Sequence, residues 1–510
     1  MNGTILMRYL KEHEGNINSK MAAYVAELET MSEVNPQAAA SIVNELKNQR
    51  SRLKLIASEN YSSLATQFSM GNLLTDKYSE GYPKHRYYAG CENVDAVEQD
   101  AVDTAKRLFG ADHAYVQPHS GADANLVAYW AILDAKVIGP EFEKIKAEHE
   151  GVKIYDDLFD DEWNRIRNVV HNQKLLSLGY GSGSHLTHGY RMNVSAQMFE
   201  CHHYEVNENG YLDYDAIEKQ AMEIKPLILL AGYSAYPRKI NFKRFREIAD
   251  KCGAVLMVDM AHFAGLVAGR VLEGEYNPVI WADVVTTTTH KTLRGPRGGM
   301  ILCRERFAES VDQGCPLVIG GPLPHVMAAK AIALQEASTP EFARYAQRIA
   351  ENAKALAKAF MDEGLTIQTG GTDNHMMLLD VTGLGLNGRQ AESILISCGI
   401  TLNRNALPFD QNGPWYTSGL RIGTPAVTTL GMGPDEMKEI ASIITDVLRH
   451  TRPAVITKGE KAGQPSRSKA VIDEDEKARA LDRVHKLLSR FVLYPELDLE
   501  FLEENFKEAE

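Results

Sequence analysis

The feature that most constrains this chain is a nearly continuous run of β-branched residues at 283–289, followed at once by His290, Lys291 and a glycine-rich turn. Such a run is typical of a strand buried on both faces of a parallel sheet, and ligands of these sheets bind beyond the carboxyl ends of the strands. The sequence therefore predicts that Lys291 is delivered to a ligand site, a geometry that suits a Schiff-base lysine. A solvated surface lysine is the commoner alternative.

A second apolar strand is predicted at 254–259, and it ends on Asp259. An aspartate at a strand end can pair with a cationic ring nitrogen, as pyridoxal phosphate requires if its ring is to accept electrons. The ordinary alternative is an aspartate that caps the next helix. Because the acid ends one strand and the lysine ends the next, adjacent strands could present both groups to one ligand.

Small residues at 117–125, including Ser120 and Gly121, precede an apolar helical run at 126–133. Free backbone N–H groups and the positive end of the helix dipole attract a phosphate there, and the Ser120 hydroxyl adds a hydrogen bond. Alone, a serine–glycine pair before a helix is more often a simple N-cap. The pair is significant here because a phosphate-binding segment is the third part that a pyridoxal-phosphate site requires, after the lysine and the aspartate.

Together with six further segments, these parts resemble the serine hydroxymethyltransferase family. The segments follow the family's order and lie at 55–61, 76–83, 86–92, 185–189, 370–375 and 418–425. The resemblance implies an α/β, aminotransferase-like fold of type I, with a large, mostly parallel-sheet domain and a smaller α+β C-terminal domain. It also implies a pyridoxal-phosphate-dependent glycine hydroxymethyltransferase of one-carbon metabolism, which moves the hydroxymethyl carbon of serine to tetrahydrofolate and gives glycine and 5,10-methylenetetrahydrofolate.

For the cofactor, the resemblance implies pyridoxal 5'-phosphate joined covalently to Lys291, with Asp259 at the ring nitrogen. The other implied cofactor contacts are His185 stacked on the ring, Ser234 and His262 near the ring hydroxyl, Ser120, Gly121 and His290 at the phosphate, and Tyr78 and Gly321 reaching the phosphate of a neighbouring subunit. The implied assembly is a homodimer or tetramer with shared active sites.

For the substrates, the resemblance places Arg421 at the amino-acid carboxylate, since a planar guanidinium pairs bidentately and stays charged. Glu80 would act as the acid/base near the hydroxymethyl group if burial keeps its carboxyl group protonated. The remaining implied positions are Ser58, Tyr88 and His262 around serine, and Leu186 and Asn405 along the folate wall. The catalytic group would comprise Lys291, Glu80, His262 and Tyr88.

Two departures from the family pattern stand out. Asp123 follows the phosphate-binding serine, and we expect it to face away because a second anion near a phosphate is unfavourable. An insertion at 136–172 carries Phe159, Trp163, Ile166 and Val170 at helical spacing, which predicts an amphipathic helix packed on the body. We expect the insertion to shape the folate entrance or the oligomer surface. Its acids are typical of a solvated helix face, so no metal site is predicted.

Breaks in the pattern predict three regions. Residues 1–52 form a helical arm, 53–325 the large cofactor-binding domain, and 326–510 the small domain, with 458–469 as a flexible polar connector. A net charge of −13 argues against nucleic acid or anionic membranes as partners. Six cysteines without paired spacing, and the lack of a bilayer-length apolar stretch, indicate a cytoplasmic protein with reduced thiols.

Two other functions remain open. Another pyridoxal-phosphate aldolase, such as a threonine aldolase, would share the lysine, the aspartate and the phosphate cradle but lack the segments around Glu80 and Asn405. A binding or regulatory protein that keeps the fold without turnover is the second alternative. Retention of Lys291, Asp259, Glu80 and Arg421 argues against it.

Overall fold

The β-branched run forms strand β9 (Val284–Thr288), which is buried along its whole length, as predicted. The computed structural model describes residues 3–507 and places β9 in a seven-stranded sheet of order β4-β10-β9-β8-β7-β5-β6. The other strands are β4 (His113–Tyr115), β5 (Lys174–Leu178), β6 (Glu200–Tyr204), β7 (Ile228–Ala231), β8 (Val255–Asp259) and β10 (Gly299–Cys303). Strands β5 to β9 are parallel, whereas β10 runs antiparallel to both of its neighbours.

Both faces of this sheet are buried, which explains why its strands are apolar without alternation. In β8, Leu256 and Val258 belong to one core cluster, and Val255 and Met257 to the cluster on the opposite face. The first face packs against α5 (Glu92–Phe109), α10 (Tyr214–Ile224), α11 (Phe242–Cys252), α12 (Ala264–Ala268) and α16 (Pro324–Ala337). The second packs against α6 (Gly121–Leu133) and α14 (Ala308–Asp312).

The small domain contains an antiparallel sheet of order β11-β12-β15-β14. Its elements are β11 (Thr366–Ile367), β12 (Met376–Asp380), β14 (Asn403–Asn405), β15 (Gly419–Gly423), α17 (Pro340–Asp362), α18 (Gly388–Ser397), α21 (Pro434–Arg449) and α22 (Glu474–Arg490). Its core also includes Leu53 and Leu55, because β1 (Leu53–Lys54) pairs with β13 (Ile400–Thr401). Two predicted boundaries therefore move: residues 53–55 belong to the small domain, and α16 packs within the large one.

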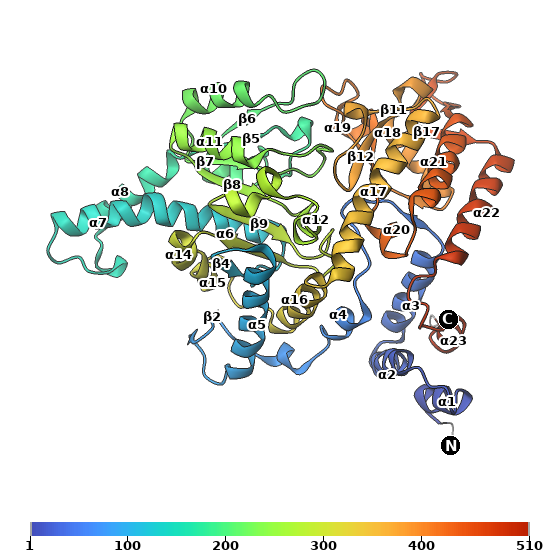
Figure 1. Cartoon of the computed structure of the whole chain (residues 1–510), viewed down its shortest axis with the longest axis horizontal. Helices are drawn as coiled ribbons and strands as arrows, with labels where there is room; N and C mark the ends of the chain where they lie inside the picture. Colours follow the sequence, from blue (N-terminus) through green and yellow to red (C-terminus); the bar gives the residue numbers. More distant parts are fainter. Residues whose placement is uncertain (1–2, 508–510) are drawn as a thin grey trace.

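The N-terminal arm is helical, as predicted, with α1 (Ile5–Glu12), α2 (Ser19–Val34) and α3 (Pro36–Arg50). These helices share a core with α23 (Leu499–Asn505), so the two ends of the chain lie side by side (Figure 1). The predicted connector at 458–469 is wrong. It forms the tip and one side of a hairpin between β16 (Thr451–Val455) and β17 (Pro465–Ile472), because β17 pairs antiparallel with β16 and packs against α18.

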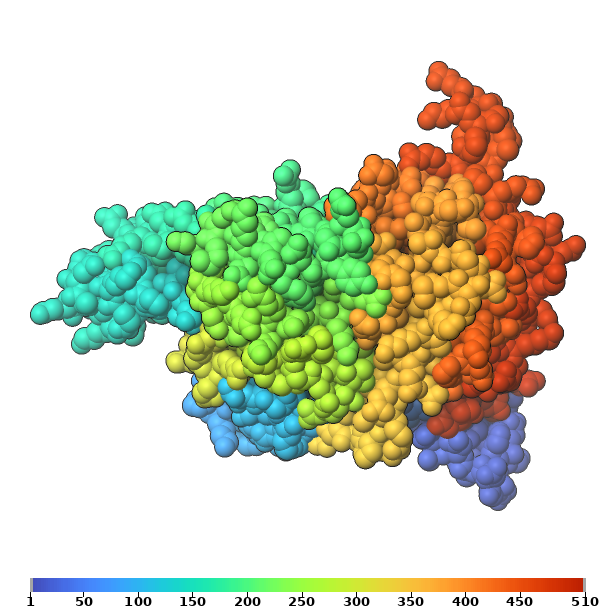
Figure 2. All heavy atoms as spheres, turned by 45° about the horizontal axis from the view of Figure 1, so that its top comes forward, coloured from blue at the N-terminus to red at the C-terminus, as the bar shows by residue number. Residues whose placement is uncertain are grey.

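The insertion forms α7 (Gly139–Glu148) and α8 (Asp160–His171), which project from the large domain on the side away from the small domain (Figures 1 and 2). Only part of the prediction holds. Ile166 and Val170 pack into the core that continues from the sheet, whereas Phe159 and Trp163 are 73% and 45% exposed. The projection leads away from the domain interface, so the structure does not support a role in shaping the folate entrance.

None of the helices described between residues 3 and 507 has the length and apolar character needed to cross a membrane.

Candidate functional site

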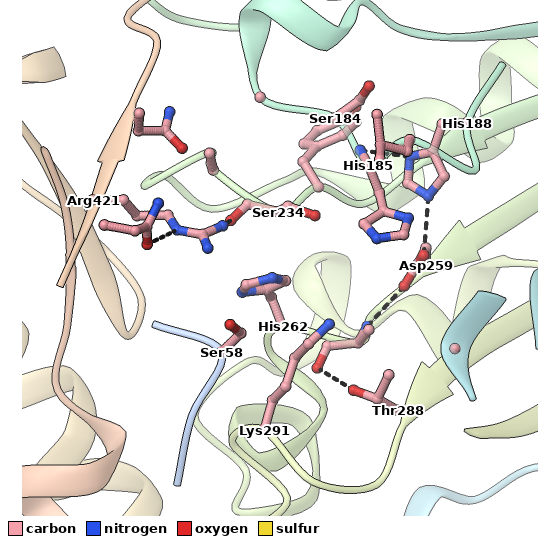
Figure 3. Close-up of a pocket in the computed structure, with 18 of the residues that line it drawn as sticks. Ser58, Ser184, His185, His188, Ser234, Asp259, His262, Thr288, Lys291 and Arg421 are labelled. Atoms are coloured by element: carbon pink, nitrogen blue, oxygen red, sulfur yellow. Dashed lines mark hydrogen bonds and ion pairs between the residues drawn. The ribbon is translucent and has the colours of Figure 1, made fainter. Parts of the chain in front are cut away.

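A cavity of about 620 Å³ lies where the carboxyl ends of the parallel strands face the small domain. Figure 3 shows Lys291, Asp259 and His262 entering it from the large domain and Arg421 entering from the small one. The predicted residues that line it are Ser58, Ser120, Gly121, His185, Leu186, Ser234, Asp259, His262, His290, Lys291, Asn405 and Arg421. Most of the predicted site therefore forms within one chain.

Lys291 lies in the loop that joins β9 to β10. The loop closes on itself, since the Thr289 N–H donates to the Gly298 carbonyl (3.1 Å) and the Gly295 N–H to the Thr289 carbonyl (2.6 Å). Burial lowers the pKa of Lys291 to about 8, although the negative charge of Asp259 opposes the shift. A substantial neutral fraction at neutral pH suits a nucleophilic amine.

Asp259 ends β8, which pairs in parallel with the strand that leads to Lys291. Its Oδ2 accepts hydrogen bonds from Asn125 Nδ2 (3.0 Å) and lies 2.9 Å from His188 Nε2. Burial alone would raise the pKa of this carboxyl, but the contacts with His188, Lys291 and Asn125 hold it well below its usual range. The carboxylate is therefore ionised. Asn125 and His188 are functional residues that the sequence did not predict, although both lie in the conspicuous segments at 117–125 and 185–189.

The N-terminus of α6, where the sequence predicts a phosphate, forms one side of the cavity. Ser120 is the N-cap, and its Oγ accepts the N–H of Asp123 (3.1 Å). The Nδ1 of His290 is buried and has no hydrogen-bond partner among the described residues. A buried donor or acceptor of this kind calls for a ligand, and burial lowers the pKa of His290 to about 3. A phosphate that occupies the cradle would supply the missing partner.

Arg421 lies on β15 and reaches across to the large domain, where its Nη1 donates to the Ser234 carbonyl (2.8 Å). Its Nε donates to Asn403 Oδ1 (3.2 Å). No carboxylate within residues 3–507 forms an ion pair with it, and burial lowers its pKa to about 10. A buried guanidinium without an anionic partner is the expected state of a receptor for a substrate carboxylate.

Two buried histidines contact each other beside the cavity, and of the two only His262 lines it. His262 Nδ1 lies 3.3 Å from His375 Nε2, and burial lowers the pKa of both, to about 3 for His375. Both rings are therefore neutral. His185 is held by a contact of 2.7 Å between its Nδ1 and Thr187 Oγ1, and burial lowers its pKa to about 4. His375 was present in a recognised segment, but only the fold reveals its contact with His262.

Leu186 and Asn405, the two residues predicted along a folate wall, line the cavity together with Tyr180 and Ser184. Asp123 does not line it, and its Oδ2 lies 3.9 Å from His119 Nδ1. The predicted outward orientation of this acid is confirmed.

Four predicted site residues, Tyr78, Glu80, Tyr88 and Gly321, lie outside this cavity, and we call them the Glu80 cluster. Tyr78 Oη donates to Glu80 Oε1 (3.2 Å), and the rings of Tyr78 and Tyr88 are 4.7 Å apart. A Cβ on Gly321 would lie 3.7 Å from the Tyr78 ring. Tyr78 and Tyr88 are 57% and 45% exposed. Glu80 and Tyr88 therefore do not line the cavity of their own chain, and their roles at the substrate stay predictions.

The fold is type I of the pyridoxal-phosphate-dependent transferases. Its marks are the sheet order, the lysine loop after β9 and the aspartate at the end of the adjacent strand β8. The family model for serine hydroxymethyltransferase matches residues 31–142 and 166–444, and the gap falls within the projecting insertion. The chain belongs to the serine hydroxymethyltransferase family.

Named relatives agree over almost the whole length. A serine hydroxymethyltransferase from Treponema pallidum (strain Nichols) is 58% identical over 508 residues, which cover 99% of this chain and 87% of that protein. One from Mycolicibacterium smegmatis is 53% identical over 479 residues, covering 94% of this chain and 95% of that protein. One from Chlamydia muridarum is 51% identical over 503 residues, covering 98% and 99%.

Proposed function

We propose that this protein transfers the hydroxymethyl carbon of serine to tetrahydrofolate, producing glycine and 5,10-methylenetetrahydrofolate. The observation that carries the proposal is the convergence of Lys291, Asp259 and an unpaired Arg421 on one cavity. An amine with a lowered pKa, an ionised carboxylate and a guanidinium without an anionic partner are the three groups needed to hold a pyridine aldehyde and an amino acid together.

The residues present fit pyridoxal 5'-phosphate. Ser120, Gly121 and His290 would hold its phosphate, Lys291 its aldehyde carbon and Asp259 its ring nitrogen, while His185 would lie on one face of the ring. When bound, the cofactor supplies an electron sink for a carbanion at the substrate α-carbon. The ionised Asp259 would keep a proton on the ring nitrogen of the bound cofactor, and the contacts of its Oδ2 with His188 and Asn125 stabilise the carboxylate.

Arg421 would bind and orient the serine carboxylate, with Ser58 beside it. The neutral His262 would lie against the amino acid without adding a competing positive charge. Leu186, Asn405 and Tyr180 would enclose the pterin and exclude water from the reacting carbon. Serine is therefore fixed by its carboxylate, and its hydroxymethyl group is directed toward the folate wall.

We further propose a homodimer in which each Glu80 cluster completes the partner subunit's site. The exposure of Tyr78 and Tyr88, and the absence of the whole cluster from the cavity of its own chain, support this arrangement. At the partner subunit's site, the Glu80 carboxyl would be the acid/base group that exchanges a proton with the serine hydroxyl.

A spectroscopic titration of the purified protein tests the function. Pyridoxal phosphate should give visible absorption that Lys291→Ala abolishes, and glycine should then produce a long-wavelength band that grows on addition of tetrahydrofolate. A coloured protein that binds glycine but ignores folate would favour a threonine-type aldolase. Absence of any response to glycine and serine would favour a protein without turnover.

A further inference from the structure

Lys330 is a buried lysine that the proposed chemistry does not use. It lies within α16, on the face that packs under the sheet, and is 2% exposed. Its Nζ donates to three backbone carbonyls, those of Val116 (2.6 Å), Pro118 (2.9 Å) and Gly299 (2.9 Å). Because a charged side chain is costly to bury, three well-placed acceptors around it mark a site with a specific structural purpose.

The three carbonyls belong to the two walls of the cofactor site. Val116 and Pro118 lie in the segment that runs from β4 into Ser120, and Gly299 begins β10 directly after the Lys291 loop. The Gly299 N–H also donates to the Pro118 carbonyl (2.9 Å). Lys330 thus joins the phosphate cradle to the lysine loop through one nitrogen atom.

Two adjacent glycines make this junction possible. A Cβ on Gly298 would lie 2.5 Å from Cε of Lys330, and one on Gly299 would lie 2.2 Å from the Ser120 carbonyl oxygen. Side chains at either position would separate the two walls. On its other side, the cradle segment is held by Gln117, whose Nε2 donates to the Gly81 carbonyl (2.8 Å) and to Glu98 Oε1 (2.7 Å).

The amine of Lys330 carries charge in this arrangement. Three acceptors around one nitrogen are satisfied only by an ammonium group, since a neutral amine has two hydrogens to donate. Burial lowers the pKa of Lys330 to about 7, and the charges of Glu98 and Asp123 act against that shift. Among the described residues no carboxylate forms an ion pair with Lys330, so its positive charge is directed at carbonyl dipoles beneath the phosphate cradle.

We propose that Lys330 is a positioning residue that fixes the spacing between the phosphate cradle and Lys291, and so sets the affinity of the site for the cofactor phosphate. The proposal rests on the proposed cofactor site. Lys330 does not line the cavity, and it acts through the carbonyls that orient the backbone leading into Ser120 and out of the Lys291 loop.

The test compares binding of pyridoxal phosphate and of pyridoxal, which lacks the phosphate, to the full-length apoprotein. Lys330→Met keeps the bulk of the side chain and removes all three donors. We expect its affinity for pyridoxal phosphate relative to pyridoxal to fall about tenfold or more, the scale of hydrogen bonds left unmade. Inorganic phosphate should also compete less well with the cofactor in this variant.

Two further variants separate positioning from general destabilisation. Gly298→Ala pushes a methyl group against Lys330 without removing the amine. It should lower the affinity for pyridoxal phosphate relative to pyridoxal by a smaller factor than Lys330→Met does. If Lys330→Met does not fold, Gly298→Ala serves as the test of the positioning role. Asn352→Leu is the matched control, because Asn352 is equally buried and donates to Thr428 Oγ1 and the Met432 carbonyl in the small domain. It should lower the melting temperature and leave the ratio unchanged.

The outcomes are distinct. If the wild-type protein does not bind pyridoxal phosphate, the proposed function fails. If the wild type binds it while a folded Lys330→Met or Gly298→Ala variant keeps the wild-type ratio, or Asn352→Leu lowers the ratio equally, the positioning role of Lys330 is overturned and the proposed function stands.

Discussion

The cavity and the Glu80 cluster differ in how far a single chain completes them. Lys291, Asp259 and Arg421 converge within one subunit, and burial or fixed hydrogen bonds shift the pKa of each. Tyr78, Glu80 and Tyr88 contact one another outside the cavity that the described residues form around Lys291. Under the proposed function, one protomer would supply most of the cofactor contacts, whereas the acid/base group and the contacts of Tyr78 and Gly321 would come from the partner subunit.

The largest effect should come from the cavity itself. Lys291→Ala removes the only amine placed between Asp259 and His262 in the described cavity, so serine turnover should fall by about 10³-fold or more, as for other groups that act as a unit. Borohydride trapping followed by peptide mapping should label Lys291 in the wild type. Label on a different side chain would show that the cavity does not hold the reactive amine, and the contrast between the cavity and the Glu80 cluster would fail.

Glu80→Gln should lower serine turnover by about 10²-fold or more while leaving cofactor binding intact, since it removes an acid/base group and nothing from the cavity. Unfolding and refolding this variant together with Lys291→Ala then shows which subunit's site Glu80 serves. If Glu80 serves the partner, random pairing restores about a quarter of wild-type activity, because each mixed dimer has one intact site. If Glu80 serves its own chain, mixing restores none.

Arg421→Ala should weaken serine binding tenfold or more, because a charge-assisted hydrogen bond is worth roughly 1.5–3 kcal/mol. Arg421→Lys keeps the charge without the bidentate geometry. Its dissociation constant for serine should therefore lie between those of Arg421→Ala and the wild type. A spectral titration with serine measures both. Equal dissociation constants for all three proteins would show that the carboxylate binds elsewhere.

The pKa of Lys291, lowered to about 8, predicts how cofactor capture varies with pH. The neutral amine is the nucleophile, so the rate at which apoprotein takes up pyridoxal should rise about tenfold per pH unit below pH 8 and level off above it. Stopped-flow absorption measures this rate. A rise that continues to pH 10 would mean that Lys291 behaves as a solvent-exposed lysine and that the cavity does not perturb it.

The smallest effect should come from matched exposed aromatics. Tyr88 and Trp163 are each 45% exposed, but only Tyr88 lies in the Glu80 cluster. Tyr88→Phe should lower kcat for serine cleavage, whereas Trp163→Phe on the projecting insertion should change it less than about twofold, as surface substitutions usually do. Light scattering on Trp163→Phe would reveal any contribution of the insertion to oligomer size. A folate-dependent defect in Trp163→Phe would revive a role for the insertion at the entrance.

The sequence predicted those parts of the site that depend on local structure. Asp259 ends one buried strand and Lys291 follows the next, so adjacency of β8 and β9 was enough to bring them together. Ser120 followed from the helix start after small residues. Their geometry is set within a few residues of each side chain, where strand and helix patterns carry the information.

Contacts between distant segments could not be predicted in this way. His188 and Asn125 meet at Asp259 only because the sheet and α6 bring them there, and His375 meets His262 across the two domains. Lys330 offered one weak signal, a lone charge within the apolar run of α16. Helical spacing in the insertion identified α8 but carried no information on which of its apolar residues would find a partner.

The pairing of the chain's two ends constrains how this protein can be made. Leu53 pairs with β13, and the apolar faces of α1 to α3 pack against Phe501 and its neighbours, which are translated long after these helices. The N-terminal helices therefore stay exposed until those distant residues have been synthesised, and closing so long a loop is slow. A chain truncated before Phe501 should still form the cofactor-binding domain, but it should bind chaperones through the exposed apolar faces of α1 to α3.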